Sequence, residues 1–155
     1  MNTVKIDKKN CRMIAHRGVS GLEKENTCAA FVAAGVKTYY GIETDVHVTA
    51  DGEYFIFHDD NMKRIAGVDM DIERSTAEQL RAVRMPDTDG KTFRSDLVVP
   101  ALKDYISICG KYDKTAVLEL KNPMERKHVL NIAALVKDMG PDGRCIKKVE
   151  AINWI

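Results

Sequence analysis

Two histidines and two closely spaced carboxylates stand out in the first 60 residues of this chain. His16 follows a short apolar run, Glu43 and Asp45 lie two positions apart, and His58 ends another apolar run. Cleavage of a phosphodiester needs an acid and a base on opposite sides of the phosphorus, together with a cation that neutralises the phosphoryl oxygens. These residue types supply all three, so the pattern indicates metal-assisted phosphodiester cleavage.

A further carboxylate lies far downstream, where Glu119 is followed two positions later by Lys121. Side chains two positions apart in a strand project from the same face, and this spacing also relates Glu43 to Asp45. We expect the three carboxylates to converge. Oxygen ligands of this kind suit Mg²⁺, Ca²⁺ or Mn²⁺ better than zinc. Lys121 and Arg17 are candidates to neutralise the phosphate.

Each of these residues also has an ordinary structural interpretation. Glu43 and Asp45 are compatible with solvated charges at a strand end, and Glu119 is compatible with a surface ion pair. His47 lies on the same strand face, which suits a pocket wall or solvent as well as contact with substrate or metal. The grouping of the carboxylates, more than any one of them, favours a chemical role.

The composition excludes several classes of protein. The 155 residues are 45% hydrophobic and 30% charged, as in a globular domain, and a net charge of only +1 does not favour a nucleic-acid partner. No segment has the length or apolar character of a signal peptide or a transmembrane helix. The cysteines form no CxxC pair, so we expect reduced thiols and a cytoplasmic protein: Cys11, Cys28, Cys109 and Cys145.

Hydrophobic patterning predicts alternating strands and helices, hence βαβ units and a parallel sheet whose ligands collect at the carboxyl ends of the strands. The predicted strands cover residues 12–15, 39–48, 54–57 and 115–121, with a turn at Asp51-Gly52. Helices are predicted from Asn26 or Thr27 to Val36, after a capping box at 75–78, from Pro100 as first residue to Gly110, and over 125–139. Residues 87–94 are expected to form a loop.

Two predictions concern the last third of the chain. The helix over 125–139 is expected to place Val129, Ile132, Ala133 and Val136 on its core face. A strand is possible from Arg144, but residues 144–155 carry too many charges for a strand buried on both faces, so we do not expect the next strand of a parallel sheet there.

Six short motifs occur in a fixed order, and together they resemble the glycerophosphodiester phosphodiesterase family. Each motif alone is weak, whereas the ordered set is specific; the resemblance fades after about Gly140. The motifs are His16-Arg17-Gly18, Glu25-Asn26-Thr27, Glu43-Thr44-Asp45, Thr49-Ala50-Asp51-Gly52, His58-Asp59 and Glu119-Leu120-Lys121.

The resemblance implies a TIM-barrel-like (β/α)₈ fold, with residues 60–99 as an insertion after the third strand of one domain covering 1–155. It implies that one divalent cation, Mg²⁺ or Ca²⁺ with Mn²⁺ as a further candidate, binds to three carboxylates. The implied substrate is a small glycerophosphodiester such as glycerophosphocholine, cleaved to glycerol 3-phosphate and an alcohol. The implied roles are metal ligation by Glu43, Asp45 and Glu119, acid–base catalysis by His16 and His58, and phosphate binding by Arg17 and Lys121.

The chain departs from the family in two respects. Lys24 stands where the family usually has proline, which loosens the entry loop. The length corresponds to about five of eight βα units, since a complete barrel needs about 250 residues. We therefore expect an incomplete barrel, and keep two alternatives: an inactive remnant that binds metal or phosphate or assembles with a partner, and a lysophospholipase D-like activity. An open barrel edge would favour a homo-oligomer.

Overall fold

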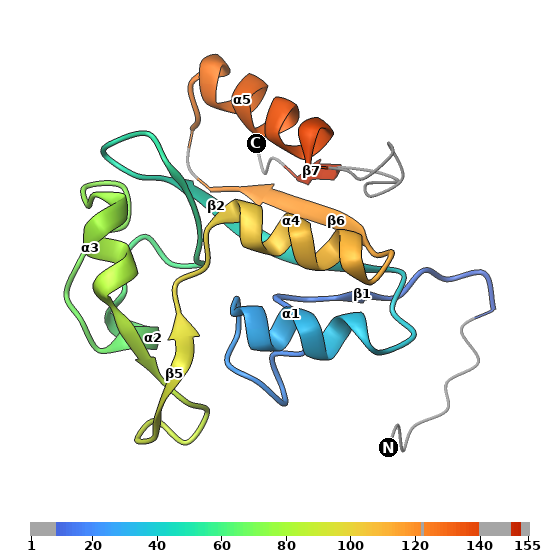
Figure 1. The fold of residues 1–155 in the computed structure, drawn as a ribbon, viewed down its shortest axis with the longest axis horizontal. Helices are drawn as coiled ribbons and strands as arrows, with labels where there is room; N and C mark the ends of the chain where they lie inside the picture. The colour runs from blue at the N-terminus through green and yellow to red at the C-terminus, as the bar shows by residue number, and fades with distance from the viewer. Residues whose placement is uncertain (1–8, 122, 140–149, 153–155) are drawn as a thin grey trace.

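The structure is a computed structural model that describes residues 9–121, 123–139 and 150–152. Strands and helices alternate along most of the chain (Figure 1). The strands are β1 (Ile14–Ala15), β2 (Gly41–Val48), β3 (Tyr54–Ile56), β4 (Arg84–Pro86), β5 (Phe93–Val98), β6 (Thr115–Leu120) and β7 (Glu150–Ile152). The helices are α1 (Cys28–Gly35), α2 (Lys63–Ala66), α3 (Ala77–Ala82), α4 (Leu102–Lys111) and α5 (Arg126–Asp138).

The main sheet has the order β1-β2-β6-β7, and its strands are parallel. β3 is antiparallel to the other strands, because it follows the predicted turn at Asp51-Gly52 and pairs with the last residues of β2. The connection between them is too short for a crossover, and Gly52 turns it with φ +84°. Thr49 closes this hairpin by donating a 2.6 Å hydrogen bond to Asp51 Oδ1.

Helices α1 and α4 lie side by side against one face of this sheet (Figure 1). Ile42 and Val46 of β2 pack there with Phe31 of α1 and Tyr105 of α4 in one buried cluster. Because side chains alternate across a strand, the residues between them point to the opposite face. The helices thus cover the even-numbered side chains of β2 and leave Glu43, Asp45 and His47 on the other side.

Tyr105 fastens α4 to the centre of the sheet. Its hydroxyl donates a 2.6 Å hydrogen bond to Ile42 O of β2 and accepts a 3.0 Å hydrogen bond from Val117 N of β6. The ring is fully buried, and burial raises the pKa of Tyr105 well above its ordinary value, so the hydroxyl stays protonated. Its contacts hold the two strands that carry the carboxylates.

Residues 60–99 form a second small core beside the main sheet. α2, α3 and the antiparallel pair β4–β5 enclose Met62, Leu80, Met85 and Leu97. The expected loop at 87–94 is confirmed as the turn between β4 and β5, although β5 already begins at Phe93. Most apolar residues of this weakly patterned stretch are therefore buried against one another, whereas Val68 and Phe93 are exposed.

Two predicted helix starts are displaced by one or two residues. The capping box of α3 uses Thr76 and Gln79 rather than residues 75 and 78, because Ser75 instead donates a hydrogen bond to Asp71 O. Pro100 lies before the first turn of α4, whose N-cap is Ala101. The carbonyl of Pro100 accepts a hydrogen bond from Ile56 N, and this bond joins β3 to the start of α4.

The last third of the chain corrects two expectations. Ile132 and Val136 of α5 are buried as predicted, but Val129 and Ala133 are exposed, so the buried face is narrower than the predicted stripe. The expectation that no further parallel strand follows is wrong, since β7 pairs parallel with β6 over Glu150–Ile152. Residues 144–149 and 153–155 of the predicted tail lie outside the described residues.

We expect Tyr105→Phe to destabilise the fold by about 1–3 kcal/mol, because it leaves buried backbone groups of β2 and β6 without their partner. The measurement is urea unfolding followed by circular dichroism. The half-buried Tyr112, at the C-terminus of the same helix, provides the matched control Tyr112→Phe, expected within about 0.5 kcal/mol of the parent. Equal effects of the two substitutions would contradict the role of the Tyr105 hydroxyl.

Candidate active site and metal centre

The three predicted carboxylates meet at the centre of the sheet. The register of the parallel β2–β6 ladder sets Asp45 opposite Glu119, and Glu43 lies two positions before Asp45 on the same face. One carboxylate oxygen of each residue lies within 4.8 Å of the others. Strand spacing and register thus explain how residues more than 70 positions apart form one cluster.

Burial decides between the two interpretations of these residues. Glu43 is 7% exposed and Asp45 only 1%, so the interpretation as solvated strand-end charges is wrong. Burial raises the pKa of Glu43 to about 7. The hydrogen bond from the Arg17 backbone lowers this pKa, whereas the negative charges of Asp45 and Glu119 raise it further. Negative charge at this cluster is therefore costly unless a cation offsets it.

Asp45 has cationic and amide neighbours, but only one of its two carboxylate oxygens accepts a hydrogen bond from them. Oδ2 accepts a 2.8 Å hydrogen bond from Asn26 Nδ2 and lies 3.6 Å from Arg17 Nε. Oδ1 lies 3.7 Å from Lys121 Nζ, and no group among the described residues donates a hydrogen bond to it. A buried carboxylate oxygen without a donor, within a cluster of oxygen ligands, fits a hard divalent cation.

The loop after β1 adopts unusual backbone angles to reach the carboxylates. Arg17 and Asn26 have φ of +52° and +54°, and Gly18 has +78°. Arg17 N donates a 2.9 Å hydrogen bond to Glu43 Oε2. A Cβ on Gly18 would lie 2.7 Å from the backbone of Ala30, so glycine lets the loop pass close to α1. Left-handed residues of this kind concentrate at functional sites.

Asn26 has a role that its sequence position concealed. Asn26 and Thr27 are the two candidates predicted for the cap of α1, and the cap is Thr27, whose Oγ1 accepts a hydrogen bond from Ala30 N. Asn26 is instead buried, and its amide donates to Asp45 while its Oδ1 accepts a 2.8 Å bond from Thr44. Only its presence in the Glu25-Asn26-Thr27 motif could have indicated this contact.

The two predicted catalytic histidines lie in different surroundings. His16 follows β1 with a side chain 68% exposed, and its Nε2 lies 3.8 Å from Glu43 Oε2. His58 follows the β2–β3 hairpin, and its Nδ1 lies 2.6 Å from Asp59 Oδ1. His16 thus contacts the carboxylate cluster directly, whereas His58 is held by its neighbour in sequence.

The basic residues lie beside the carboxylates. Lys121 Nζ donates a 2.9 Å hydrogen bond to Glu119 Oε1, so the expected ion pair forms and also extends toward Asp45. Arg17 lies between Asp45 and Glu25. Its Nη1 donates a 3.0 Å hydrogen bond to Glu25 Oε1. Both side chains are 18% exposed, which leaves each cation open to a ligand on the solvent side.

His47 is fully buried on the carboxylate face of β2, and its Nδ1 lies 3.4 Å from Glu73 Oε1. A solvent role for His47 is therefore wrong. His128 of α5, an ordinary histidine in the sequence, lies with its Nδ1 3.1 Å from the hydroxyl of Tyr54.

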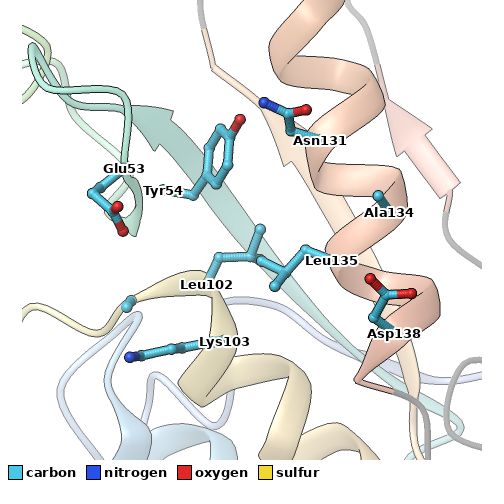
Figure 2. A pocket seen from close by; sticks show the side chains of 9 residues that line it. Glu53, Tyr54, Leu102, Lys103, Asn131, Ala134, Leu135 and Asp138 are labelled. Atoms are coloured by element: carbon cyan, nitrogen blue, oxygen red, sulfur yellow. The ribbon is translucent and has the colours of Figure 1, made fainter.

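A pocket of about 370 Å³ lies away from this cluster, between α4, α5 and the start of β3 (Figure 2). Tyr54, Leu102 and Leu135 contribute much of its apolar wall, and Lys103 and Asp138 lie at its side. It contains none of the predicted site residues. The residues suited to phosphodiester chemistry are therefore gathered elsewhere, on the carboxylate face of β2 and β6.

The sequence profile of the "Glycerophosphoryl diester phosphodiesterase family" matches residues 16–152, which is most of the chain. The chain belongs to this family. The match continues well beyond Gly140, where the resemblance had been expected to fade, and it includes β7.

A relative that is similar in sequence supports this membership, and a solved structure shows a similar fold. The glycerophosphodiester phosphodiesterase of Caldanaerobacter subterraneus subsp. tengcongensis is 31% identical over 110 residues, covering 71% of this chain and 45% of the relative. A glycerophosphodiester phosphodiesterase from Agrobacterium tumefaciens superposes with a TM-score of 0.73 at 22% identity, over 89% of this chain and 55% of that one.

An Oleispira antarctica phosphodiesterase solved with its product sn-glycerol-3-phosphate gives a TM-score of 0.69 at 27% identity, over 84% of this chain and 53% of that one. The chain thus spans about half the length of the relatives it matches. Its parallel sheet and packed helices correspond to part of their TIM-barrel-like fold. Among the described residues, no helix has the length and apolar character needed to cross a membrane.

We expect divalent cations to stabilise this family member through its carboxylate cluster. At a cation concentration about 100 times Kd, the free energy of unfolding should rise by about 2.7 kcal/mol. Thermal unfolding with Mg²⁺, Ca²⁺ or Mn²⁺, compared with chelator, measures the effect. Asp45→Asn should abolish it, whereas Glu78→Gln, at an exposed position of α3, should respond as the parent does. An equal response of Asp45→Asn and the parent would place any bound cation elsewhere.

Proposed function

We propose that this chain is a metal-dependent phosphodiesterase that cleaves glycerophosphodiesters to glycerol 3-phosphate and an alcohol. The observation that carries the proposal is the buried carboxylate cluster on β2 and β6, flanked by a histidine and two basic side chains. Membership of the glycerophosphoryl diester phosphodiesterase family and the product complex of the Oleispira enzyme support the substrate class.

In this proposal Glu43, Asp45 and Glu119 hold one divalent cation, Mg²⁺ or Ca²⁺, with Mn²⁺ as the third candidate. When bound, the cation supplies positive charge that stabilises the phosphoryl oxygens of the substrate. The unpartnered Asp45 Oδ1 and the raised pKa of Glu43 support its binding here, because both reflect negative charge without full compensation.

Arg17 and Lys121 bind the phosphate from either side of Asp45. Each uses one donor within the protein, Arg17 to Glu25 and Lys121 to Glu119. An arginine has five N–H donors and a lysine three, so each retains donors for phosphoryl oxygens. Their contacts with the carboxylates restrict where those donors point, which orients the phosphodiester relative to the histidines.

His16 and His58 transfer protons from the attacking hydroxyl and to the leaving alcohol oxygen. One takes a proton from the attacking hydroxyl, which forms a new bond to phosphorus, and the other gives a proton to the alcohol oxygen as its bond to phosphorus breaks. The attacking hydroxyl is either water or a hydroxyl of the substrate's glycerol. Because Asp59 contacts Nδ1 of His58, the atom that His58 has available for this exchange is Nε2.

The test is release of glycerol 3-phosphate from glycerophosphocholine by the purified chain, with Mg²⁺, Ca²⁺, Mn²⁺ or chelator. We expect metal-dependent turnover that falls about 10²- to 10⁴-fold in His16→Gln and in His58→Gln. His128→Gln, outside the cluster, should retain the activity of the parent. Turnover that persists in chelator, or in both histidine variants, would contradict this mechanism.

Two arms of the same assay test the alternative functions. Lysophosphatidylcholine replaces the first substrate in one arm, and release of lysophosphatidic acid there would indicate lysophospholipase D activity. In the other arm, the cation-dependent rise in thermal stability is measured on the same preparation. A rise without turnover on either substrate would identify an inactive protein that retains the metal site.

We further propose that two copies assemble along a sheet edge. β1 is one of the two outer strands of the parallel sheet, and its Ile14 and the preceding Met13 are 37% and 45% exposed. An outer strand with exposed apolar side chains offers unpaired backbone groups to a second chain. Sedimentation equilibrium should show a dimer that Ile14→Lys weakens, and a monomer at all concentrations would contradict this assembly.

A further inference from the structure

A chain of ionic contacts connects the two histidine-bearing loops, and its central member is Arg64 of α2. Arg64 Nε donates a 2.7 Å hydrogen bond to Asp59 Oδ2, and its Nη2 donates a 2.9 Å bond to Asp59 Oδ1. This is a bidentate contact between a planar guanidinium and a carboxylate, which fixes both groups in orientation as well as in distance. Asp59 in turn lies 2.6 Å from His58 Nδ1.

The other side of the same guanidinium contacts the loop after β1. Arg64 Nη2 lies 2.9 Å from Glu25 Oε1, and the same oxygen accepts a 3.0 Å bond from Arg17 Nη1. Burial opposes ionisation of Glu25, but Arg64 and Arg17 outweigh it and lower the pKa of Glu25 below its ordinary value. Arg64 therefore joins the loop that carries Arg17 to the loop that carries His58.

These contacts determine which nitrogen of His58 carries a proton. The hydrogen bonds from Arg64 hold the pKa of Asp59 at about 2, with a smaller contribution from His58, so Asp59 is ionised and can only accept. The Nδ1 of His58 must then donate to Asp59, and in the neutral ring the lone pair is on Nε2. A carboxylate held in this way keeps an imidazole in one tautomer and one orientation.

We propose that Arg64 is a positioning residue of the active site: its fork on Asp59 and its contact with Glu25 hold His58 in the Nδ1–H tautomer, facing the phosphate that Arg17 binds. The inference rests on the proposed function, in which His58 exchanges a proton through Nε2. It assigns a role in catalysis to a residue of the 60–99 segment, none of whose residues entered the predicted site.

The surroundings of Arg64 argue against a purely structural role. Its side chain is 50% exposed and lies on a helix of only four residues, so its ionic contacts contribute little to stability. The same contacts nevertheless determine the orientation of two carboxylates. A lysine could preserve the charge, but it lacks the planar fork that engages both oxygens of Asp59.

Nitrogen-15 NMR of the histidine side chains tests the inference directly, using the 155-residue chain at about pH 8, where imidazoles are mostly neutral. His58→Gln assigns the signals. The parent should show His58 as the Nδ1–H tautomer, and Arg64→Met should show exchange between both tautomers. Arg64→Lys retains the positive charge and serves as a second variant should Arg64→Met fold poorly. It should show a mixture of the two His58 tautomers. Arg74→Met, which removes another arginine of the same segment with an 88% exposed side chain, should match the parent.

Kinetics on glycerophosphocholine supply the second readout. Arg64→Met should lower kcat by about 10- to 100-fold with little change in KM, as expected for a residue that orients a catalytic group. Retention of the single His58 tautomer, or of full kcat, in Arg64→Met or Arg64→Lys would overturn the inference. If the parent shows no turnover, the proposed function fails while the tautomer measurement still decides whether Arg64 positions His58.

Discussion

The buried carboxylates of β2 impose the constraint on which the rest of the structure depends. Ionised side chains are expensive to remove from water, and each of Glu43 and Asp45 requires donors or cations close by. The backbone of Arg17 adopts a left-handed conformation and donates a hydrogen bond to Glu43. Asn26 is also left-handed, and its side-chain amide donates a hydrogen bond to Asp45. These contacts use one oxygen of each carboxylate, and among the described residues no group donates a hydrogen bond to the buried Asp45 Oδ1, where a divalent cation could bind.

The same electrostatic requirement extends outward from the sheet. Arg17 contacts Glu25, Glu25 contacts Arg64, and Arg64 contacts Asp59 beside His58. Opposite charges alternate along this series, so each member offsets its neighbour in a partly buried environment. The 60–99 segment therefore does more than pack its own small core, because α2 contributes the cation that joins the two histidine-bearing loops. The candidate site therefore draws on residues from both parts of the described chain.

Local patterns predicted the regular elements well where one physical signal dominated. Thr27 begins α1 because its hydroxyl caps the helix, and the largely apolar run in 115–121 produces β6 against β2. Errors arose where tertiary contacts competed with local preference. Ser75 bonds to Asp71 and leaves the capping box to Thr76, and the charged residues around Glu150 did not prevent β7 from pairing with β6.

The sequence by itself determined the family, the order of the motifs and the identity of the carboxylates and histidines, because those features are properties of residue type and spacing. The tertiary structure decided how they are connected. Strand register brought Asp45 beside Glu119, and chain folding brought Arg64 to Glu25, 39 positions earlier. Such long-range contacts leave no periodic trace in the sequence, since an arginine in a weakly patterned segment has the same local appearance whether it faces solvent or orients a catalytic histidine.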